Sequence, residues 1–212
     1  MPKLEHLTQY ILEKYKPISI ILHGSRASGK NRPHSDWDFI LLLSLPKKVV
    51  IREIREGENI EVVAKVLPIK DTEILDVFGV KLRNAQVLFD TDGVGAHIVS
   101  VGQEKLKEPM GLSGDEKTSR VLHLYGRLMG MEEIIDTPEL FFDYASDFYE
   151  RAIMYWFHVF HDSWSLPPYE SMPYIKEKEP EFYSQLLIIA TGNNQEKLKA
   201  AKEIYKKFEK FL

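Results

Sequence analysis

Residues 18–43 read ISIILHGSRASGKNRPHSDWDFILLL, and this segment decides the fold of the first half of the chain. Its two short apolar runs, Ile18–Leu22 and Phe39–Leu43, predict buried β-strands. The stretch between them, residues 24–35, is too rich in Gly, Ser, Asn and Pro to continue either strand. The segment therefore predicts two strands joined by a polar loop.

Two carboxylates stand where this loop enters the second strand. Because side chains alternate along a strand, Asp36 and Asp38 should share one face, with Trp37 and Phe39 on the other. Two neighbouring carboxylates repel each other unless a cation lies between them. A hard divalent ion such as Mg²⁺ suits such oxygen ligands and keeps open positions for phosphate oxygens. The pair therefore predicts a magnesium site.

The end of the first strand has the features of a phosphate-binding loop. Gly24 would let a phosphate approach the backbone, and the hydroxyl of Ser25 with the following amides could donate to it, especially if a helix starts here. Arg26 and Lys30 add positive charge to the same loop. A phosphate loop beside a metal-binding pair is typical of metal-assisted phosphoryl or nucleotidyl transfer.

A third acidic ligand is expected from a neighbouring strand. A strand is predicted over residues 60–67, and Glu61 lies near its start. Alternation places Lys65 on the same face, where it could meet a triphosphate. Glu61 is therefore the candidate for the third carboxylate of the metal site.

The composition indicates an ordinary globular protein. The 212 residues suit one large domain or two small ones, with 44% hydrophobic and 28% charged residues. A net charge of -4 gives no general attraction to nucleic acid or to an anionic membrane. There is no cysteine, so disulfides and thiolate metal ligands are excluded. The charged N-terminal stretch is unlike a signal peptide, and no apolar run reaches the roughly 18 residues of a membrane span, so we expect a cytoplasmic protein without a membrane partner.

The two halves of the chain differ in pattern. Residues 1–110 alternate helical and strand patterns, including a helix predicted from Pro46 to Gly57, a helix over residues 72–82 and a strand over residues 86–89. Residues 111–212 read as helices only. Their predicted spans are 115–135, 140–161 with Thr137 as N-cap, 171–191 with a break near Pro180, and 195–212. The predicted fold class is α+β: a mixed sheet with helices on one side in residues 1–110, followed by an α-helical bundle domain in residues 111–212.

The stretch HGSRASGKNRPHSDWDFILL resembles the signature of the polymerase-β-type nucleotidyltransferase superfamily. The minimal and kanamycin-type branch is the most similar, since its pattern is often GSRARG followed by SDxD. The resemblance implies that Asp36 and Asp38 ligate two Mg²⁺ ions, with Glu61 as the third catalytic carboxylate and metal ligand. The predicted nucleotide-binding residues are Gly24, Ser25, Arg26, Lys30, Ser35 and Lys65.

The resemblance also implies a reaction. A hydroxyl of an acceptor would attack the α-phosphate of a nucleoside triphosphate, most commonly ATP, and pyrophosphate would leave. Glu61 could act as general base, as could Asp147 or Glu150 from the second half. The acceptor could be a small molecule, a protein hydroxyl or an RNA end. The helical half would bind the acceptor or a second copy of the chain in a homodimer.

Three other interpretations of these residues compete with that of a nucleotidyltransferase. Residues 24–31 nearly match a P-loop, but Asn31 replaces the Ser or Thr ligand and no long helix follows. Arg151 and His158 have a spacing that resembles the R-x4–6-H motif of helical RNases, although packing among aromatic residues explains His158 better. A regulatory, antitoxin-like binding protein that keeps the nucleotidyltransferase fold without catalysis is the main alternative function.

Overall fold

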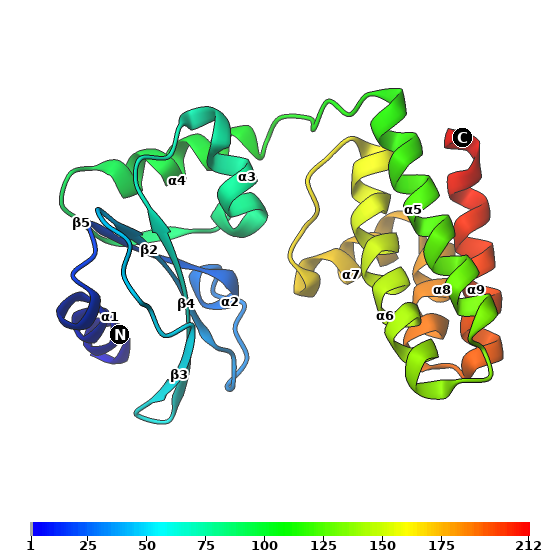
Figure 1. Cartoon of the computed structure of the whole chain (residues 1–212), viewed down its shortest axis with the longest axis horizontal. Coiled ribbons are helices and arrows are strands. Elements are labelled where there is room, and N and C mark those ends of the chain that lie inside the picture. Colours follow the sequence, from blue (N-terminus) through cyan, green and yellow to red (C-terminus); the bar gives the residue numbers. More distant parts are fainter. Residues whose placement is uncertain (1) are drawn as a thin grey trace. The chain divides into compact units, whose positions relative to one another are not determined.

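The computed structural model describes residues 2–212, which form two compact units (Figure 1). The first unit ends at Glu108 and the second begins at Pro109. Each unit has a hydrophobic core of its own. The fold class agrees with the prediction, because a mixed sheet with helices is followed by a helical bundle.

The first unit is built on a five-stranded sheet with the order β3-β4-β2-β1-β5. The strands β2 and β4 run parallel, and the other neighbours are antiparallel. The strands are β1 (Ser19–His23), β2 (Trp37–Leu43), β3 (Arg52–Arg55), β4 (Glu58–Val66) and β5 (Gln86–Asp90). The strands β1 and β2 come from the two apolar runs of residues 18–43, as predicted.

Helices lie on both faces of this sheet rather than on one. Helix α1 (Pro2–Tyr15) packs its buried side chains against one face, which includes Ile20 and Phe39. Helix α4 (Val94–Lys105) lies on the opposite face, where Gly95 comes so near Ser19 that an added Cβ would be 2.0 Å from the Ser19 Oγ. The shorter helical segments are α2 (Gly24–Ala27), α3 (Ile74–Phe78) and the 3-10 turns Asp71–Glu73 and Gly79–Leu82.

The helix predicted from Pro46 to Gly57 is wrong, because this region forms the edge strand β3 and a hairpin turn. Glu56 and Gly57 connect β3 to β4 with φ angles of 52° and 76°. Arg55 pairs with Glu58, so the loop has two residues. Two positive φ angles in a two-residue loop are typical of a type I′ turn, whose twist matches that of the strands.

The second unit is a bundle of helices, as predicted. Its aromatic core includes Phe141, Phe148 and Trp156, all completely or almost completely buried. The first helix has Ser113 as its N-cap with Glu116 three residues later, and so begins slightly before the predicted span of 115–135. The helices are α5 (Gly114–Glu133), α6 (Pro138–Tyr155) with the π-helical segment Trp156–Phe160, α7 (Pro168–Lys178), α8 (Pro180–Thr191), and α9 (Asn194–Phe208) with the 3-10 turn Glu209–Phe211.

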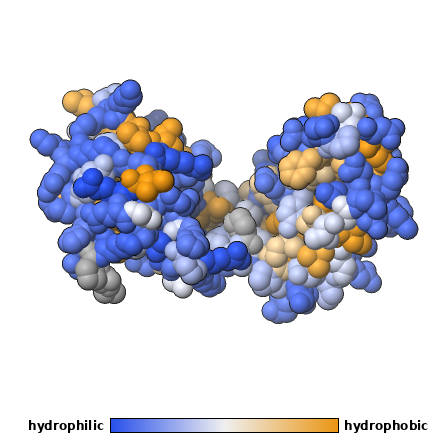
Figure 2. Space-filling model, turned by 90° about the horizontal axis from the view of Figure 1, so that it is seen from below, coloured by the Kyte–Doolittle hydropathy of each residue, from blue (hydrophilic) through white to orange (hydrophobic). Residues whose placement is uncertain are grey.

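The surface of each unit is mainly hydrophilic, with hydrophobic side chains scattered among polar ones in the view of Figure 2. The most exposed large hydrophobic side chains of the first unit are near the edge strand β3, namely Leu45, Ile51 and Ile54. Within residues 2–212, no helix combines the length and the apolar character needed to cross a bilayer.

Candidate active site

Three adjacent strands bring His23, Asp38 and Glu61 side by side. His23 ends β1 and pairs with Asp38, and Asp38 pairs with Glu61 of β4. Paired residues of neighbouring strands point to the same face, about 5 Å apart. Trp37 and Phe39 lie on the other face of the sheet, because both join the core beneath α1. Asp38 and Glu61 therefore share one face of the sheet, whereas Asp36 lies just before β2, which begins at Trp37.

Gly24 is in contact with the carboxylate of Asp38. Its φ angle is +74°, and a Cβ on this residue would lie 2.4 Å from the Asp38 Oδ2. Only glycine satisfies both the backbone conformation and the close approach. Ser25 follows in the first turn of α2, so the loop predicted to bind phosphate begins at the carboxylate.

The charges around Asp38 repel each other. Burial raises the pKa of Asp38 to about 6, with further contributions from the carboxylates of Glu61 and Asp36. Burial also lowers the pKa of His23 to about 4, and the nearby Lys81 adds to this effect. A cation bound between the carboxylates would relieve the repulsion.

Glu61 already has a cationic partner. The Nε and Nη2 atoms of Arg52 lie 2.8 Å and 2.7 Å from the same carboxylate oxygen, Oε2. Arg52 pairs directly with Glu61 across the β3–β4 hairpin and its side chain is 77% exposed, against 25% for Glu61. Arg52 is absent from the predicted site, because the sequence pattern of residues 46–57 predicts a helix in place of β3. A strand ending at the Glu56-Gly57 turn would have placed it opposite Glu61.

Lys81 is a second residue that sequence reasoning missed. It is exposed and belongs to the 3-10 turn Gly79–Leu82. Its charge acts on both Asp38 and His23, lowering the pKa of each. No local motif marks this lysine, because only the folding of the chain after β4 brings it to the carboxylates.

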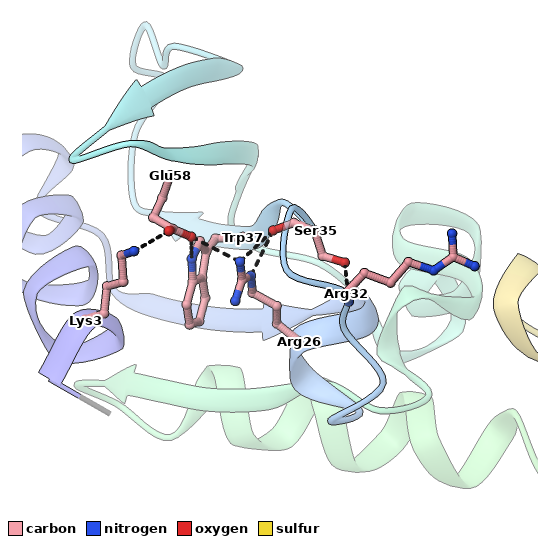
Figure 3. A network of polar contacts seen from close by, with 6 residues as sticks. All are labelled: Lys3, Arg26, Arg32, Ser35, Trp37 and Glu58. Atoms are coloured by element: carbon pink, nitrogen blue, oxygen red, sulfur yellow. Dashed lines mark hydrogen bonds and ion pairs between the residues drawn. The ribbon is translucent and has the colours of Figure 1, made fainter.

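The structure does not bring Arg26 to the carboxylates (Figure 3). Its Nε and Nη2 donate to the carbonyl oxygen of Ser35 at 3.0 Å and 2.7 Å, and its Nη2 pairs with Glu58 at 3.0 Å. The guanidinium also lies 4.1 Å from the ring centroid of Trp37, whose Nε1 donates to Glu58. Lys3 pairs with the same carboxylate. Arg26 thus ties the loop before β2 to β4, on the face opposite Asp38.

The remaining predicted nucleotide-binding residues lie at the borders of this site. Lys30 is exposed just after α2, and its backbone N–H donates to the carbonyl of Ser25 at 2.9 Å. The Ser35 hydroxyl oxygen accepts from the backbone N–H of Arg32 at 2.9 Å, which shapes the loop. Lys65 lies on the Glu61 face of β4, four residues further along the strand. Their binding roles stay predictions.

The three carboxylates fit a hard divalent cation in their chemistry, because carboxylate oxygens are the ligands that such ions prefer. As placed, they do not form a closed ligand set: within residues 2–212 no three His, Cys, Asp or Glu side chains are arranged to hold a metal ion. Asp36 and Asp38 are the nearer pair in sequence, and both Arg52 contacts fall on one carboxylate oxygen of Glu61, Oε2.

Comparison with protein families agrees with this geometry. Residues 4–75 match the family described as "Nucleotidyltransferase domain". The match lies within the first unit and covers about a third of the chain. A solved structure that is similar is a nucleotidyltransferase-like protein from Exiguobacterium sibiricum 255-15, with 8% identity and a TM-score of 0.49 over 96% of this chain and 75% of that one. No curated protein matches the chain.

Proposed function

We propose that this protein transfers a nucleoside monophosphate from a nucleoside triphosphate, most commonly ATP, to a hydroxyl group of an acceptor. The observation that carries the proposal is the contact of Gly24 with Asp38, beside Glu61, within a nucleotidyltransferase domain. This contact puts the start of the predicted phosphate loop against the carboxylates where a triphosphate would meet a cation.

In this proposal the acceptor oxygen forms a bond to the α-phosphorus while the bond to the bridging oxygen of the β-phosphate breaks. Pyrophosphate leaves, and the hydroxyl proton passes to a base, for which Glu61 is the candidate in the first unit. Mg²⁺, predicted as two ions, would be held by Asp36 and Asp38 with Glu61, and would supply charge neutralisation to the triphosphate. The exposed Lys81 adds positive charge near the same carboxylates.

The two units have different roles in this proposal. The first unit, predicted over residues 1–110, would carry the catalytic residues. The second, over residues 111–212, would bind the acceptor or a second copy of the chain. The acceptor class stays open between a small molecule, a protein hydroxyl and an RNA end, and the cytoplasm is the compartment we propose.

The test is pyrophosphate release from each of the four common nucleoside triphosphates, with Mg²⁺ and a panel of hydroxyl acceptors. Asp36→Asn and Asp38→Asn should each reduce release by several orders of magnitude, because each removes a charged ligand. Asp143→Asn, at an exposed position of α6, is the matched control and should leave release unchanged. Release that persists in both aspartate variants would disprove the assignment.

A second candidate function is a regulatory protein that keeps this fold without catalysis. The observation that favours it is the ion pair of Arg52 with Glu61, which already balances the charge of the predicted third carboxylate. This candidate predicts that no triphosphate and acceptor pair supports pyrophosphate release, and that Arg52→Gln does not restore it.

A further inference from the structure

The strand β3 lies at the edge of the five-stranded sheet (Figure 1). In the part of the chain that the structure describes, β3 pairs with β4 alone, so its other side is open. This edge also exposes apolar side chains, because Ile54 is 76% exposed and Ile51, directly before the strand, is 67% exposed. An open edge of this kind is a place where another strand can add to the sheet.

The backbone of β3 directs the hydrogen-bonding groups of Arg52 and Ile54 outward. The N–H of Val62 donates to the carbonyl oxygen of Ile51 at 2.8 Å, so these two residues form a hydrogen-bonded pair of the hairpin. Hydrogen-bonded and non-hydrogen-bonded pairs alternate along an antiparallel ladder. The pairs of β4 with Arg52 and with Ile54 are therefore non-hydrogen-bonded. The N–H and C=O groups of Arg52 and Ile54 point away from β4, towards the open edge.

These outward groups restrict how two copies of β3 can pair with each other. In a symmetric antiparallel pair, outward residues must lie opposite outward residues, so the two-fold axis passes one residue of β3 that lies opposite its own copy. With Arg52, Glu53 or Arg55 on the axis, two like charges would lie directly opposite each other, which destabilises a strand pair. Only Ile54 on the axis avoids this repulsion.

The same register makes the neighbouring pairs complementary in charge. With Ile54 on the axis, Glu53 lies opposite Arg55 of the second copy, and Arg52 lies opposite Glu56. Each pair occurs twice because of the symmetry. The two exposed Ile54 side chains cover each other, and the N–H of each Ile54 donates to the C=O of the other.

The charges of this edge cancel within one chain. Residues 52–56 contain two arginines and two glutamates. The ion pairs of this strand add one charge of each sign: the Arg52 Nη2 lies 2.7 Å from the Glu61 Oε2, and the Lys14 Nζ lies 2.7 Å from the Glu53 Oε2. A second copy therefore meets no net charge at this edge, and its own charges fall opposite charges of the other sign.

We propose that two copies of this chain associate through β3, antiparallel and with Ile54 on the two-fold axis, so that the two sheets continue into each other. Closed two-fold interfaces of this kind are the most common form of homo-oligomer. The interface belongs to the first unit alone and is independent of the proposed nucleotidyl transfer.

The test is sedimentation velocity of the full-length protein over a series of concentrations. Ile54→Lys and Ile54→Glu each put two like charges on the axis, so each variant should be monomeric at concentrations at which the wild type is a dimer. An equimolar mixture of the two variants puts lysine opposite glutamate and should form the dimer again. Ile54 is exposed, so both variants should fold, and their unfolding free energies check this.

A charge reversal beside the axis tests the register. Glu56→Arg places an arginine opposite Arg52 twice and should raise the dissociation constant of the dimer about tenfold. Glu133→Arg makes the same change at an exposed position of α5 and should leave the dissociation constant unchanged. Asp38→Asn should abolish nucleotidyl transfer and preserve the dimer, so the two proposals can fail separately.

Three results would overturn the proposal. The wild type could stay monomeric at every concentration. The mixture of the two folded Ile54 variants could stay monomeric as well. A dimer that is unaffected by the variants at Ile54 and Glu56 would use another surface of the chain.

Discussion

At residue 24, both the backbone conformation and a close side-chain contact require glycine. The sequence suggested that this glycine allows a phosphate to approach the backbone. The structure adds that the carboxylate of Asp38 already occupies the space in which a Cβ would lie, at a φ of +74°. A side chain at residue 24 would therefore displace the predicted metal ligand as well as strain the backbone.

The first prediction compares this glycine with a neighbour. Gly24→Ala should destabilise the first unit more than Gly29→Ala, since Gly29 has a similar φ of +72° but no atom within 4 Å of an added Cβ. The conformational cost common to both is about 1 kcal/mol, and the contact with Asp38 adds to it. Urea unfolding measures the two free energies. If both variants lost the same unfolding free energy, the contact with Asp38 would contribute nothing to the cost of a side chain at residue 24.

The second prediction concerns His158. Its pKa of about 4 in the folded protein, caused by burial and then by Arg120, lies below the value near 6.5 of an unfolded chain. The unfolded state therefore takes up the proton first as the pH falls. The neutral His158 therefore contributes its full share to the free energy of unfolding above about pH 6.5. This contribution is lost as the pH falls towards 4, by up to about 3 kcal/mol.

This loss is measured as the change in unfolding free energy between pH 6.5 and pH 4 in the wild type and in His158→Gln. The variant should lose less stability over this range than the wild type does. His6→Gln, at an exposed position of α1, should behave like the wild type. A pH dependence that is the same in all three proteins would rule out a neutral, buried His158.

At the scale of the element, the edge strand β3 explains the main error in the predicted fold. Pro46 and the spacing of Val49, Val50 and Ile54 favour a helix, and Gly57 would end it. β-branched residues also suit a strand, and the decisive signal was the pair Glu56-Gly57. It forms a turn with positive φ at both positions, although its first residue is not the usual Asn or Asp.

The third prediction tests this turn. Glu56→Asn should stabilise the first unit by about 1 kcal/mol, because asparagine adopts a positive φ with less strain than glutamate. Glu56→Gln removes the same charge without relieving the backbone and serves as the control. Thermal unfolding should show a higher Tm for the asparagine variant only. If the Tm rose equally in both variants, the loss of the Glu56 charge, and not the backbone conformation, would explain the stabilisation.

The fourth prediction tests the pairing of Arg52 with Glu61. Arg52→Gln should increase the affinity for Mn²⁺, used as a paramagnetic substitute for Mg²⁺, by about fivefold, on the scale of ~1 kcal/mol for a partly exposed ion pair. Arg55→Gln removes a charge from an exposed position of the same strand, opposite Glu58, and is the control. If the two variants bind Mn²⁺ equally, Arg52 does not compete with the metal for Glu61.

At the scale of the whole molecule, the sequence predicted best what depends on local pattern. Apolar runs located β1 and β2, and Thr137-Pro138 marked the start of α6. These features depend on a few neighbouring residues. The match of residues 4–75 to a nucleotidyltransferase domain supports the superfamily, whereas its kanamycin-type branch stays a prediction.

The contacts that were missed join segments far apart in the chain. Arg26 was expected to face the phosphates, but its partner Glu58 comes from a strand 32 residues later and holds it on the other face. Lys81 reaches Asp38 only because the chain folds back after β4. Spacing within one segment contains no information about such partners.

The central claim is that the contact of Gly24 with Asp38 belongs to a nucleotidyl-transfer site. The most direct measurement incubates the protein and its Asp38→Asn variant with Mg²⁺, acceptors and a nucleoside triphosphate labelled at the α- or the γ-phosphate. The account predicts that α-label appears on an acceptor, that γ-label appears only in pyrophosphate, and that the variant shows neither. Transfer of γ-label to an acceptor, or α-transfer that survives in Asp38→Asn, would contradict it.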